Sequence, residues 1–307
     1  MKTEALRMAF TQELLALAKN DPSLFAVATD SRGSVTLTDF ADQLPEQFVE
    51  CGIAEQDAIG ISAGLACGGL RPFVCGPACF YTLRSAEQVK VDVAYSHTNV
   101  KIIGVSGGVS YGALGSTHHA TQDVALLRAI PGIQIFLPCD GSQMRALTDY
   151  LAKSNEPAYV RVGRGAVPEV YETEIPFVPG KANRLRGGKD GALIACGEMV
   201  YPALEAAKEL EKQHCFVSVY DMHTLRPLDE EAVLEAAETG YVVTVEEHNV
   251  HGGLGSAVAE VLCQKKPTPM RILGLPDEKL YNGTSAQVFA HYGLTAEGIA
   301  KTMLERR

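Results

Sequence analysis

The feature that most constrains the fold is the alternation of two patterns along the chain. Short apolar runs rich in β-branched residues, each typical of a buried strand, are followed by longer segments with helical spacing. The expected strands are LFAVATD, RPFVCGPA, NVKIIGVSGG, IQIFLPC and AYVRVGR in the first half and GALIACG, CFVSVYD and YVVTVEE in the second. Strands that alternate with helices form mainly parallel sheets covered by helices. The sequence therefore predicts an α/β protein.

The alternation fails once, near the middle of the chain. The stretch PEVYETEIPFVPGKANRLRGGKD mixes proline, glycine and charge without periodicity, which is typical of a linker. A length of 307 residues also favours about two domains. We therefore expect two doubly wound, mainly parallel-sheet domains at residues 1–170 and 189–307, joined by a linker at 171–188.

The charge and the apolar runs exclude several classes of protein. The chain has 27 basic and 37 acidic side chains, a net charge of −10, which disfavours nucleic acid and anionic membrane surfaces as partners. No run approaches 18 apolar residues, and the charged start MKTEALRMAFTQELLALAKN lacks the apolar core of a signal peptide. We expect a cytoplasmic protein with no membrane segment.

The eight cysteines lie mostly inside apolar segments. Buried free thiols in a reducing compartment explain this pattern better than disulfides. Cys75 and Cys79 are the closest pair, but no second pair follows to complete a zinc site. We expect no metal site on this chain.

Glu55 lies in CGIAEQDAIG, a segment otherwise dominated by small and apolar residues. A carboxylate at the start of a helix can simply interact with the helix dipole and the free amides. The alternative is a buried carboxylate that takes part in proton transfer. The residues alone leave both interpretations open.

Two adjacent histidines, His118 and His119, lie in the glycine-rich segment GGVSYGALGSTHHATQD before a helix. Imidazole can exchange a proton with a sugar hydroxyl or carbonyl near neutral pH. We expect one of the two to be structural. We interpret His248 and His251 as hydrogen-bonding groups of a loop or an interface, and HGGLGSAVAE as a tight strand-to-helix turn without a nucleotide fingerprint.

Arg164 ends the expected strand AYVRVGR, at the edge of the sheet where doubly wound folds bind ligands. A guanidinium there can form a bidentate contact with a phosphate or carboxylate. The alternative is an ordinary surface arginine.

Taken in order, these pieces resemble the C-terminal half of the transketolase family of thiamine diphosphate enzymes. The matching segments are FVECGIAEQDAIGISAGLACGGLRPFV, GALGSTHH, LLRAIPG, IFLPCDG, YDMHTLRPLD and VTVEEHNVHGGLGSAVAEVL. The resemblance covers nearly the whole chain. It implies that residues 1–170 form the pyrimidine-binding domain and residues 189–307 the transketolase C-terminal domain.

The resemblance also implies a missing part. The family's diphosphate-binding domain, which holds the diphosphate and Mg²⁺ through a G-D-G…N motif, has no counterpart in these 307 residues. The chain therefore resembles one subunit of a split transketolase. We expect an N-terminal transketolase subunit as partner, self-association and a heterotetramer.

The resemblance implies four cofactor residues. Glu55 falls on the glutamate that hydrogen-bonds N1′ of the aminopyrimidine. Tyr81, or its neighbour Phe80, falls where an aromatic ring stacks on the pyrimidine, and Asp30 matches a carboxylate near the thiazolium.

The resemblance implies substrate residues as well. His118 matches a histidine that contacts oxygens of the donor sugar, so it is expected to serve both binding and catalysis. Ser34 and Arg164 fall near positions that hold a sugar phosphate.

Three departures from the family pattern affect the expected substrate. The pattern G-E-D-G-P-T-H-Q becomes GALGSTHH, so Leu114 replaces an aspartate and His119 replaces the glutamine. Ser106 stands where a histidine or aspartate is common. We expect two-carbon ketol transfer from an unusual sugar or sugar phosphate, with Ser106 and His119 near the substrate.

Three other functions stay open at this point. The β subunit of a 2-oxo acid dehydrogenase shares the two-domain plan and the cofactor glutamate. A deoxyxylulose-phosphate synthase-like condensation is another, although those chains normally carry all three domains. A non-catalytic assembly subunit is the third, but it would have no need of Glu55, Tyr81 and His118.

Overall fold

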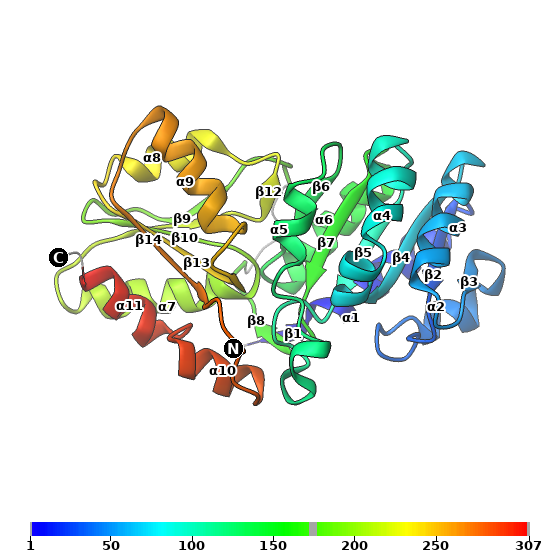
Figure 1. Cartoon of the computed structure of the whole chain (residues 1–307), viewed down its shortest axis with the longest axis horizontal. Helices are drawn as coiled ribbons and strands as arrows, with labels where there is room; N and C mark the ends of the chain where they lie inside the picture. Colours follow the sequence, from blue (N-terminus) through cyan, green and yellow to red (C-terminus); the bar gives the residue numbers. More distant parts are fainter. Residues whose placement is uncertain (1, 172–176, 306–307) are drawn as a thin grey trace. The chain divides into compact units, whose positions relative to one another are not determined.

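The computed structural model describes residues 2–171 and 177–305. The chain divides into two compact units (Figure 1). The first consists of Met1–Gly107 and Leu126–Phe177, and the second of Gly108–Ala125 and Val178–Arg307. Within the expected linker at 171–188, residues 172–176 lie outside the described residues.

The first unit is built on a parallel sheet in which its strands lie in the order β6-β7-β5-β4-β2-β3. The elements up to the end of β8 are β1 Thr3–Ala5, α1 Leu6–Ala18, β2 Leu24–Ala28, α2 Thr38–Gln43, η1 Pro45–Gln47, β3 Phe48–Glu50, α3 Glu55–Cys67, β4 Arg71–Pro77, η2 Phe80–Arg84, α4 Ala86–Gln88, η3 Val89–Tyr95, β5 Lys101–Val105, η4 Gly112–Thr117, α5 Asp123–Arg128, β6 Gln134–Phe136, α6 Gly141–Lys153, β7 Ala158–Val162 and β8 Ala166–Pro168.

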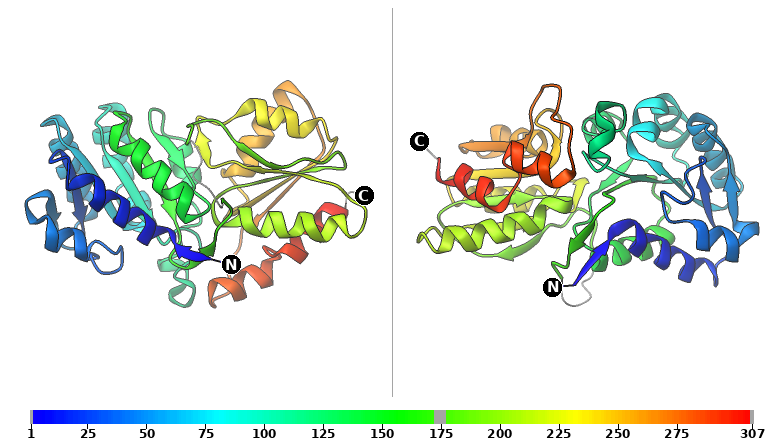
Figure 2. Two further views of the ribbon diagram at one scale, coloured as in Figure 1. Left: turned by 180° about the vertical axis from the view of Figure 1, so that it is seen from behind. Right: turned by 90° about the horizontal axis from the view of Figure 1, so that it is seen from below.

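The central strands β5 and β7 are buried along their whole length. Parallel strands covered by helices on both faces read as continuous apolar runs, which is why the sequence predicted them. Helices α1 and α6 pack together over one face of the sheet, and α3 and α4 lie on the other (Figures 1 and 2). Phe10 of α1 meets Phe73 of β4 with ring centroids 6.0 Å apart in the core.

The segment after β4 is less regular than the sequence predicts. SAEQVKVDVAYSH favours one ordinary helix, but most of residues 80–95 form two π-helical stretches, η2 and η3, separated by the short α4. π-Helical turns are rare in proteins, and those that occur often lie at functional sites.

The second unit has a five-stranded sheet in the order β14-β13-β10-β11-β9. Its remaining elements are β9 Asn183–Arg186, β10 Ala192–Ala195, η5 Gly197–Met199, α7 Val200–Glu211, β11 Ser218–Asp221, β12 Thr224–Arg226, α8 Glu230–Ala237, β13 Val242–Asn249, α9 Leu254–Lys265, β14 Met270–Leu275, α10 Ser285–Tyr292 and α11 Ala296–Leu304. Strands β10, β11, β13 and β14 are parallel. Helices α7 and α11 cover one face, and α8 and α9 cover the other (Figures 1 and 2).

The region expected to be irregular contains two short strands. β8 pairs antiparallel with β1, and β9 pairs antiparallel with β11 at the edge of the second sheet. Edge strands of three or four residues have one face in water, so they carry no run of apolar residues. The sequence pattern therefore could not reveal them.

All eight cysteines are free, but only four are buried. Cys75, Cys79, Cys139 and Cys196 lie in the core, whereas Cys67 and Cys263 are exposed. The expectation of buried thiols thus holds for half of them. Among the described residues, no helix combines the length and the apolar character needed to cross a bilayer.

Candidate active site

Glu55 is the first residue of α3 and its side chain is almost completely buried, with 4% of the residue exposed. Its Oε2 accepts a hydrogen bond from a guanidinium nitrogen of Arg84 at 2.9 Å. The position beside the helix N-terminus suits a carboxylate. Its partner, however, is a side chain of η2, so the dipole interpretation alone does not account for the contact.

An aromatic pair stands beside this carboxylate. The guanidinium of Arg84 lies over the ring of Phe80, 4.1 Å from its centroid. Phe80 is half-buried, whereas Tyr81 is fully buried and its hydroxyl lies 3.2 Å from Oγ1 of Thr29. Burial raises the pKa of Tyr81, which keeps the phenol neutral. Of the two rings, Phe80 has the exposed surface.

Sequence reasoning missed Arg84. Its only signal is the spacing of four residues from Phe80, which places a cation and a ring on one face of a helix. That spacing is too common to identify a functional residue by itself.

Asp30 and Ser106 both adopt left-handed backbone conformations shortly after parallel strands. Their φ angles are +50° and +64°, at the carboxyl ends of β2 and β5. Such conformations are strained for residues other than glycine and gather at functional sites. The Asp30 amide donates to Oε1 of Glu50 at 2.7 Å. Ser106 is buried, and its hydroxyl has no hydrogen-bond partner among the described residues.

Ser34 and Arg164 are both half-buried. The carbonyl of Ser34 accepts from a guanidinium nitrogen of Arg7 at 2.5 Å. Arg164 lies in the turn two residues beyond the end of β7. Ser34, Asp30, Ser106 and Arg164 all follow strands of the parallel sheet, the edge where doubly wound folds bind ligands.

The two adjacent histidines belong to the second unit and differ in environment. His118 is half-buried, with Nδ1 2.9 Å from Oγ1 of Thr117 and its ring edge-on to Tyr111. His119 is buried, and its Nε2 lies 3.2 Å from the carbonyl of Gly112. Because a carbonyl only accepts, Nε2 carries the hydrogen. Burial lowers the pKa of His119, which favours the neutral ring.

The structure thus brings Glu55, Phe80 and Arg84 together in the first unit, with Tyr81 buried behind them. It gathers His118 and His119 in one loop of the second unit. Leu114, on the same loop, is more than half exposed.

His248, His251 and the HGGLGSAV turn all have polar partners within the second unit. His248 is buried and contacts the amide of Ala125 and the carbonyl of Asn249, whereas His251 is exposed beside Asp277. At the HGGLGSAV turn, the amides of Leu254 and Gly255 donate to the carboxylate of Glu246. These two amides are therefore not free to bind a phosphate.

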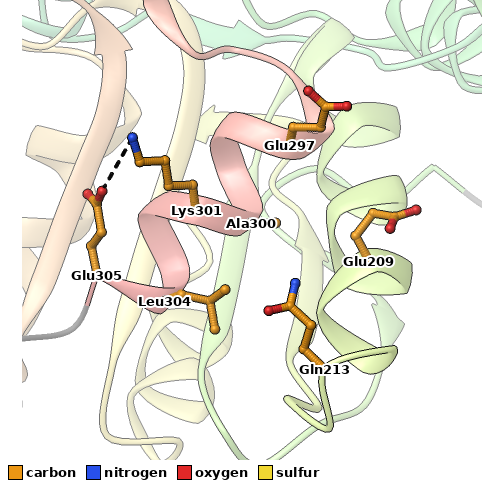
Figure 3. A pocket seen from close by; sticks show the side chains of 7 residues that line it. All are labelled: Glu209, Gln213, Glu297, Ala300, Lys301, Leu304 and Glu305. Atoms are coloured by element: carbon orange, nitrogen blue, oxygen red, sulfur yellow. Dashed lines mark ion pairs between the residues drawn. The ribbon is translucent and has the colours of Figure 1, made fainter.

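No group of three or more histidine, cysteine or acidic side chains in the described residues is arranged to hold a metal ion. A surface hollow of about 500 Å³ lies between α7 and α11 (Figure 3). Its charged lining is Glu209, Glu297, Glu305 and Lys301, and Lys301 pairs with Glu305 at 3.8 Å. An acidic lining of this kind repels anions, so we assign it no substrate.

Comparison with known proteins identifies the class. The family model for the transketolase pyrimidine binding domain matches residues 2–169, and that for the transketolase C-terminal domain matches residues 180–299. The chain belongs to the transketolase family. The family and the α/β fold with two domains, both predicted from the sequence, are confirmed.

Several similar proteins are described as single subunits of a transketolase. The chain is 58% identical over 303 residues to one subunit of an apulose-4-phosphate transketolase from Phocaeicola vulgatus, covering 98% of this chain and 97% of the relative. It is 37% identical to a 6-deoxy-6-sulfo-D-fructose transketolase subunit from a Clostridium species, covering 98% and 94%. A solved structure described as a split gene transketolase, inactive β4 tetramer, is 38% identical with a TM-score of 0.91, covering 98% of both chains.

Proposed function

We propose that this chain is the pyrimidine-binding subunit of a thiamine diphosphate-dependent transketolase, a transferase of the cytoplasm that moves a two-carbon ketol unit between sugars or sugar phosphates. The observation that carries the proposal is Glu55, a buried carboxylate at the start of α3 beside Arg84 and Phe80. The family match and the subunit relatives support it.

Glu55 would hold N1′ of the aminopyrimidine through its carboxylate and so take part in activating the bound cofactor. Thiamine diphosphate, when bound, supplies the stabilisation of the carbanion. Arg84 holds the Glu55 carboxylate through a charge-assisted hydrogen bond, which fixes its orientation. Burial of Glu55 keeps water away from the atoms that exchange the proton.

The aromatic pair orients the pyrimidine. Phe80 offers a half-buried ring for stacking, and Tyr81 is the buried member of the pair. Stacking of this kind adds about 0.5–1.5 kcal/mol beyond burial. Asp30 lies near the thiazolium in this assignment.

Polar groups at the strand ends and in the histidine loop bind the sugar. His118 contacts the donor oxygens and exchanges a proton with them, and we assign His119 and Ser106 to sugar binding as well. Ser34 and Arg164 hold the phosphate, since a guanidinium matches the geometry of phosphate oxygens. The orphaned hydroxyl of Ser106 supports its part, because a buried donor without a partner calls for a ligand or water.

The residues present fit the pyrimidine end of the cofactor and not its diphosphate end. The described residues contain no group of acidic or histidine side chains placed to hold a metal ion. We infer that an N-terminal transketolase subunit holds the diphosphate and Mg²⁺ and that the two subunits form a heterotetramer. The solved relative described as an inactive β4 tetramer supports both self-association and the need for a partner.

One surface of the first unit suits such association. Five large apolar side chains lie on two packed parts of the first unit, α3 with the two residues before it and the η2–η3 segment, and are exposed: Ile53, Ile61, Leu83, Val91 and Tyr95. Clustered exposed apolar side chains mark protein interaction sites. We assign this surface to a contact between subunits.

The relatives suggest the donor. The 58% identical relative is described as acting on apulose 4-phosphate. Leu114 stands where the common family pattern has an aspartate. This replacement is expected for a donor sugar that lacks the usual arrangement of hydroxyl groups. We propose a ketose phosphate of this kind as donor, with xylulose 5-phosphate a poor substitute.

The test uses the chain alone and reconstituted with a subunit that carries the G-D-G…N domain. We expect turnover of apulose 4-phosphate by the complex with thiamine diphosphate and Mg²⁺, and none by the chain alone. Glu55→Gln keeps the size of the side chain but removes its charge, so kcat/KM should fall about a hundred- to ten-thousandfold. Asp57→Asn, in the same first turn of α3 but exposed, is the matched control and should stay near the wild type.

Near-normal turnover by a folded, assembled Glu55→Gln complex would refute the cofactor assignment. Turnover by the chain alone would refute the split enzyme. Equal kcat/KM with xylulose 5-phosphate would refute the donor assignment and leave the other two intact.

A further inference from the structure

Residues 108–120 form the loop that carries His118, and the two ends of this loop are joined. The backbones of Gly108 and Ala120 exchange both hydrogen bonds, at 3.0 and 2.8 Å, and so join the two ends of the loop. Inside it, the amides of His118 and His119 both donate to the carbonyl of Gly115. Compact loops with joined ends are frequently functional.

The start of this loop is held by Glu247, near the end of β13. Its Oε1 accepts from the amide of Val109 at 2.7 Å, and only 5% of Glu247 is exposed. A Cβ added to Gly108 would lie 2.1 Å from the same oxygen, so only glycine fits beside this carboxylate. A buried hydrogen bond to a charged acceptor contributes more than one between neutral groups.

The segment that follows the loop, residues 121–125, is held by the next two residues of the same strand. Nε2 of His248 accepts from the amide of Ala125 at 3.3 Å, while its Nδ1 donates to the carbonyl of Asn249 at 2.7 Å. The amide of Asn249 donates to the carbonyl of Thr121 at 2.9 Å. Three consecutive residues therefore contact the start of the loop and the segment that follows it.

A break in the strand pairing frees these residues to do so. β13 pairs with β14 at Val245 and Leu273 and again at Asn249 and Leu275, so three residues of β13 face only Gly274. Bulges of this kind redirect side chains and are common beside functional sites. Glu246, the first residue of the bulge, caps α9 instead.

We propose that Glu247, together with His248 and Asn249, positions the loop that presents His118 to the substrate. The bulged end of β13 would then act on substrate binding through the loop, and Glu247 itself touches no reacting atom. This inference rests on the proposed role of His118 as a substrate ligand.

The first arm of the test measures hydrogen exchange in the full chain by mass spectrometry. In Glu247→Ala, the amides of residues 109–119 should exchange roughly ten- to a hundredfold faster, because the amide of Val109 loses a charged acceptor. Glu247→Gln keeps an oxygen acceptor and should restore most of the protection. Glu246→Ala is the matched control: it removes a neighbouring buried carboxylate and should loosen α9 rather than the loop.

The second arm measures kinetics of the reconstituted complex with apulose 4-phosphate. Glu247→Ala should raise the donor KM about tenfold or more, with kcat changed less than about threefold and the apparent affinity for thiamine diphosphate unchanged. Should Glu247→Ala fail to fold, Glu247→Asp keeps the charge but shortens the reach, and the same directions are expected.

The outcomes separate the two proposals. Unchanged exchange of the loop, or faster exchange with an unchanged donor KM, would overturn the positioning role. If His118→Ala also leaves the donor KM unchanged, the assignment of His118 to the substrate fails, and with it the basis of the inference. Raised KM in both His118→Ala and Glu247→Ala, with rescue in Glu247→Gln, supports both.

Discussion

Gly76 and Tyr81 are in such close contact that one methyl group would not fit between them. A Cβ built on Gly76 would lie 2.2 Å from Cε2 of Tyr81, whose ring is fully buried at the end of β4. The ring cannot move outward without leaving its hydroxyl contact to Thr29. Position 76 therefore has no space for a side chain.

The first prediction compares two glycines. Gly76→Ala should lower the free energy of unfolding by about 1–3 kcal/mol, the usual cost of overpacking a core. Gly64→Ala, on the exposed face of α3, meets no atom within 4 Å and should raise it by about 0.5–1 kcal/mol. Urea unfolding of both variants measures the difference. Equal stability of the two would contradict the packing of Tyr81.

At the residue scale, the sequence indicated which residues could be functional and said less about how exposed each side chain is. Glu55 and His118 stand in motifs specific enough to be singled out. The burial of Tyr81 rather than Phe80 was not predictable, because the π-helical turn that carries both rings changes which residues face the core. Arg84 was missed because its spacing from Phe80 is too common to identify a functional residue.

Asp140 holds two elements of the first unit together. One oxygen of its fully buried carboxylate caps α6 by accepting from the amide of Gln143 at 2.8 Å. The other accepts from the amides of Val170 and Tyr171, also at 2.8 Å. A single side chain thus joins the start of α6 to the segment that follows β8.

The second prediction concerns a variant that lacks these three hydrogen bonds. Asp140→Ala should cost about 3 kcal/mol or more, because the cap is lost and two part-buried amides lose a charged acceptor. Thr295→Ala removes a cap with one bond, to the amide of Gly298, and should cost about 1 kcal/mol. Thermal and urea unfolding of both variants measure the ratio of the two losses in free energy of unfolding. A cost for Asp140→Ala no larger than that for Thr295→Ala would contradict the joining role.

At the element scale, the buried strands and most helices followed from apolar periodicity. The edge strands β1, β8 and β9 did not, since half-solvated strands of three or four residues leave no pattern. The π-helical stretches have the composition of an ordinary helix. Their geometry depends on packing against α3 and β4 rather than on composition.

At the scale of the whole molecule, the division into two domains was predictable and the contacts of one loop were not. The predicted boundary at residue 170 and the family model for residues 2–169 both place the histidine loop in the first domain. Its contacts group Gly108–Ala125 with the second unit, through Glu247, His248 and Asn249. Contacts between residues more than a hundred positions apart leave no periodicity in either segment. The polar run EEHN at the end of an apolar strand was the one available signal.

The stability of the whole fold should depend on pH through one buried lysine. Lys101 begins β5 and is fully buried, and its ammonium group donates to Oδ1 of Asn99 and to the carbonyls of Ser154 and Glu156. Desolvation lowers the pKa of Lys101 from 10.5 to about 7, although the Glu156 carboxylate opposes the shift. Between pH 7 and 10.5 the unfolded chain therefore holds a proton that the folded chain has released.

The last prediction follows from this sign. Because the unfolded state binds more protons in that window, the contribution of Lys101 to stability must rise with pH, by up to about 1.4 kcal/mol per pH unit. Lys101→Met removes the titrating group at similar volume, so stability should rise with pH less steeply in the variant than in the wild type between pH 7 and 9. Lys90→Met, which removes an exposed lysine, controls for the loss of a positive charge and should follow the wild type. Urea unfolding of the wild type and both variants at pH 7, 8 and 9 gives, for each protein, the slope of the free energy of unfolding against pH. Parallel slopes for wild type and Lys101→Met would mean that Lys101 keeps its proton in the fold, held by its three oxygen acceptors.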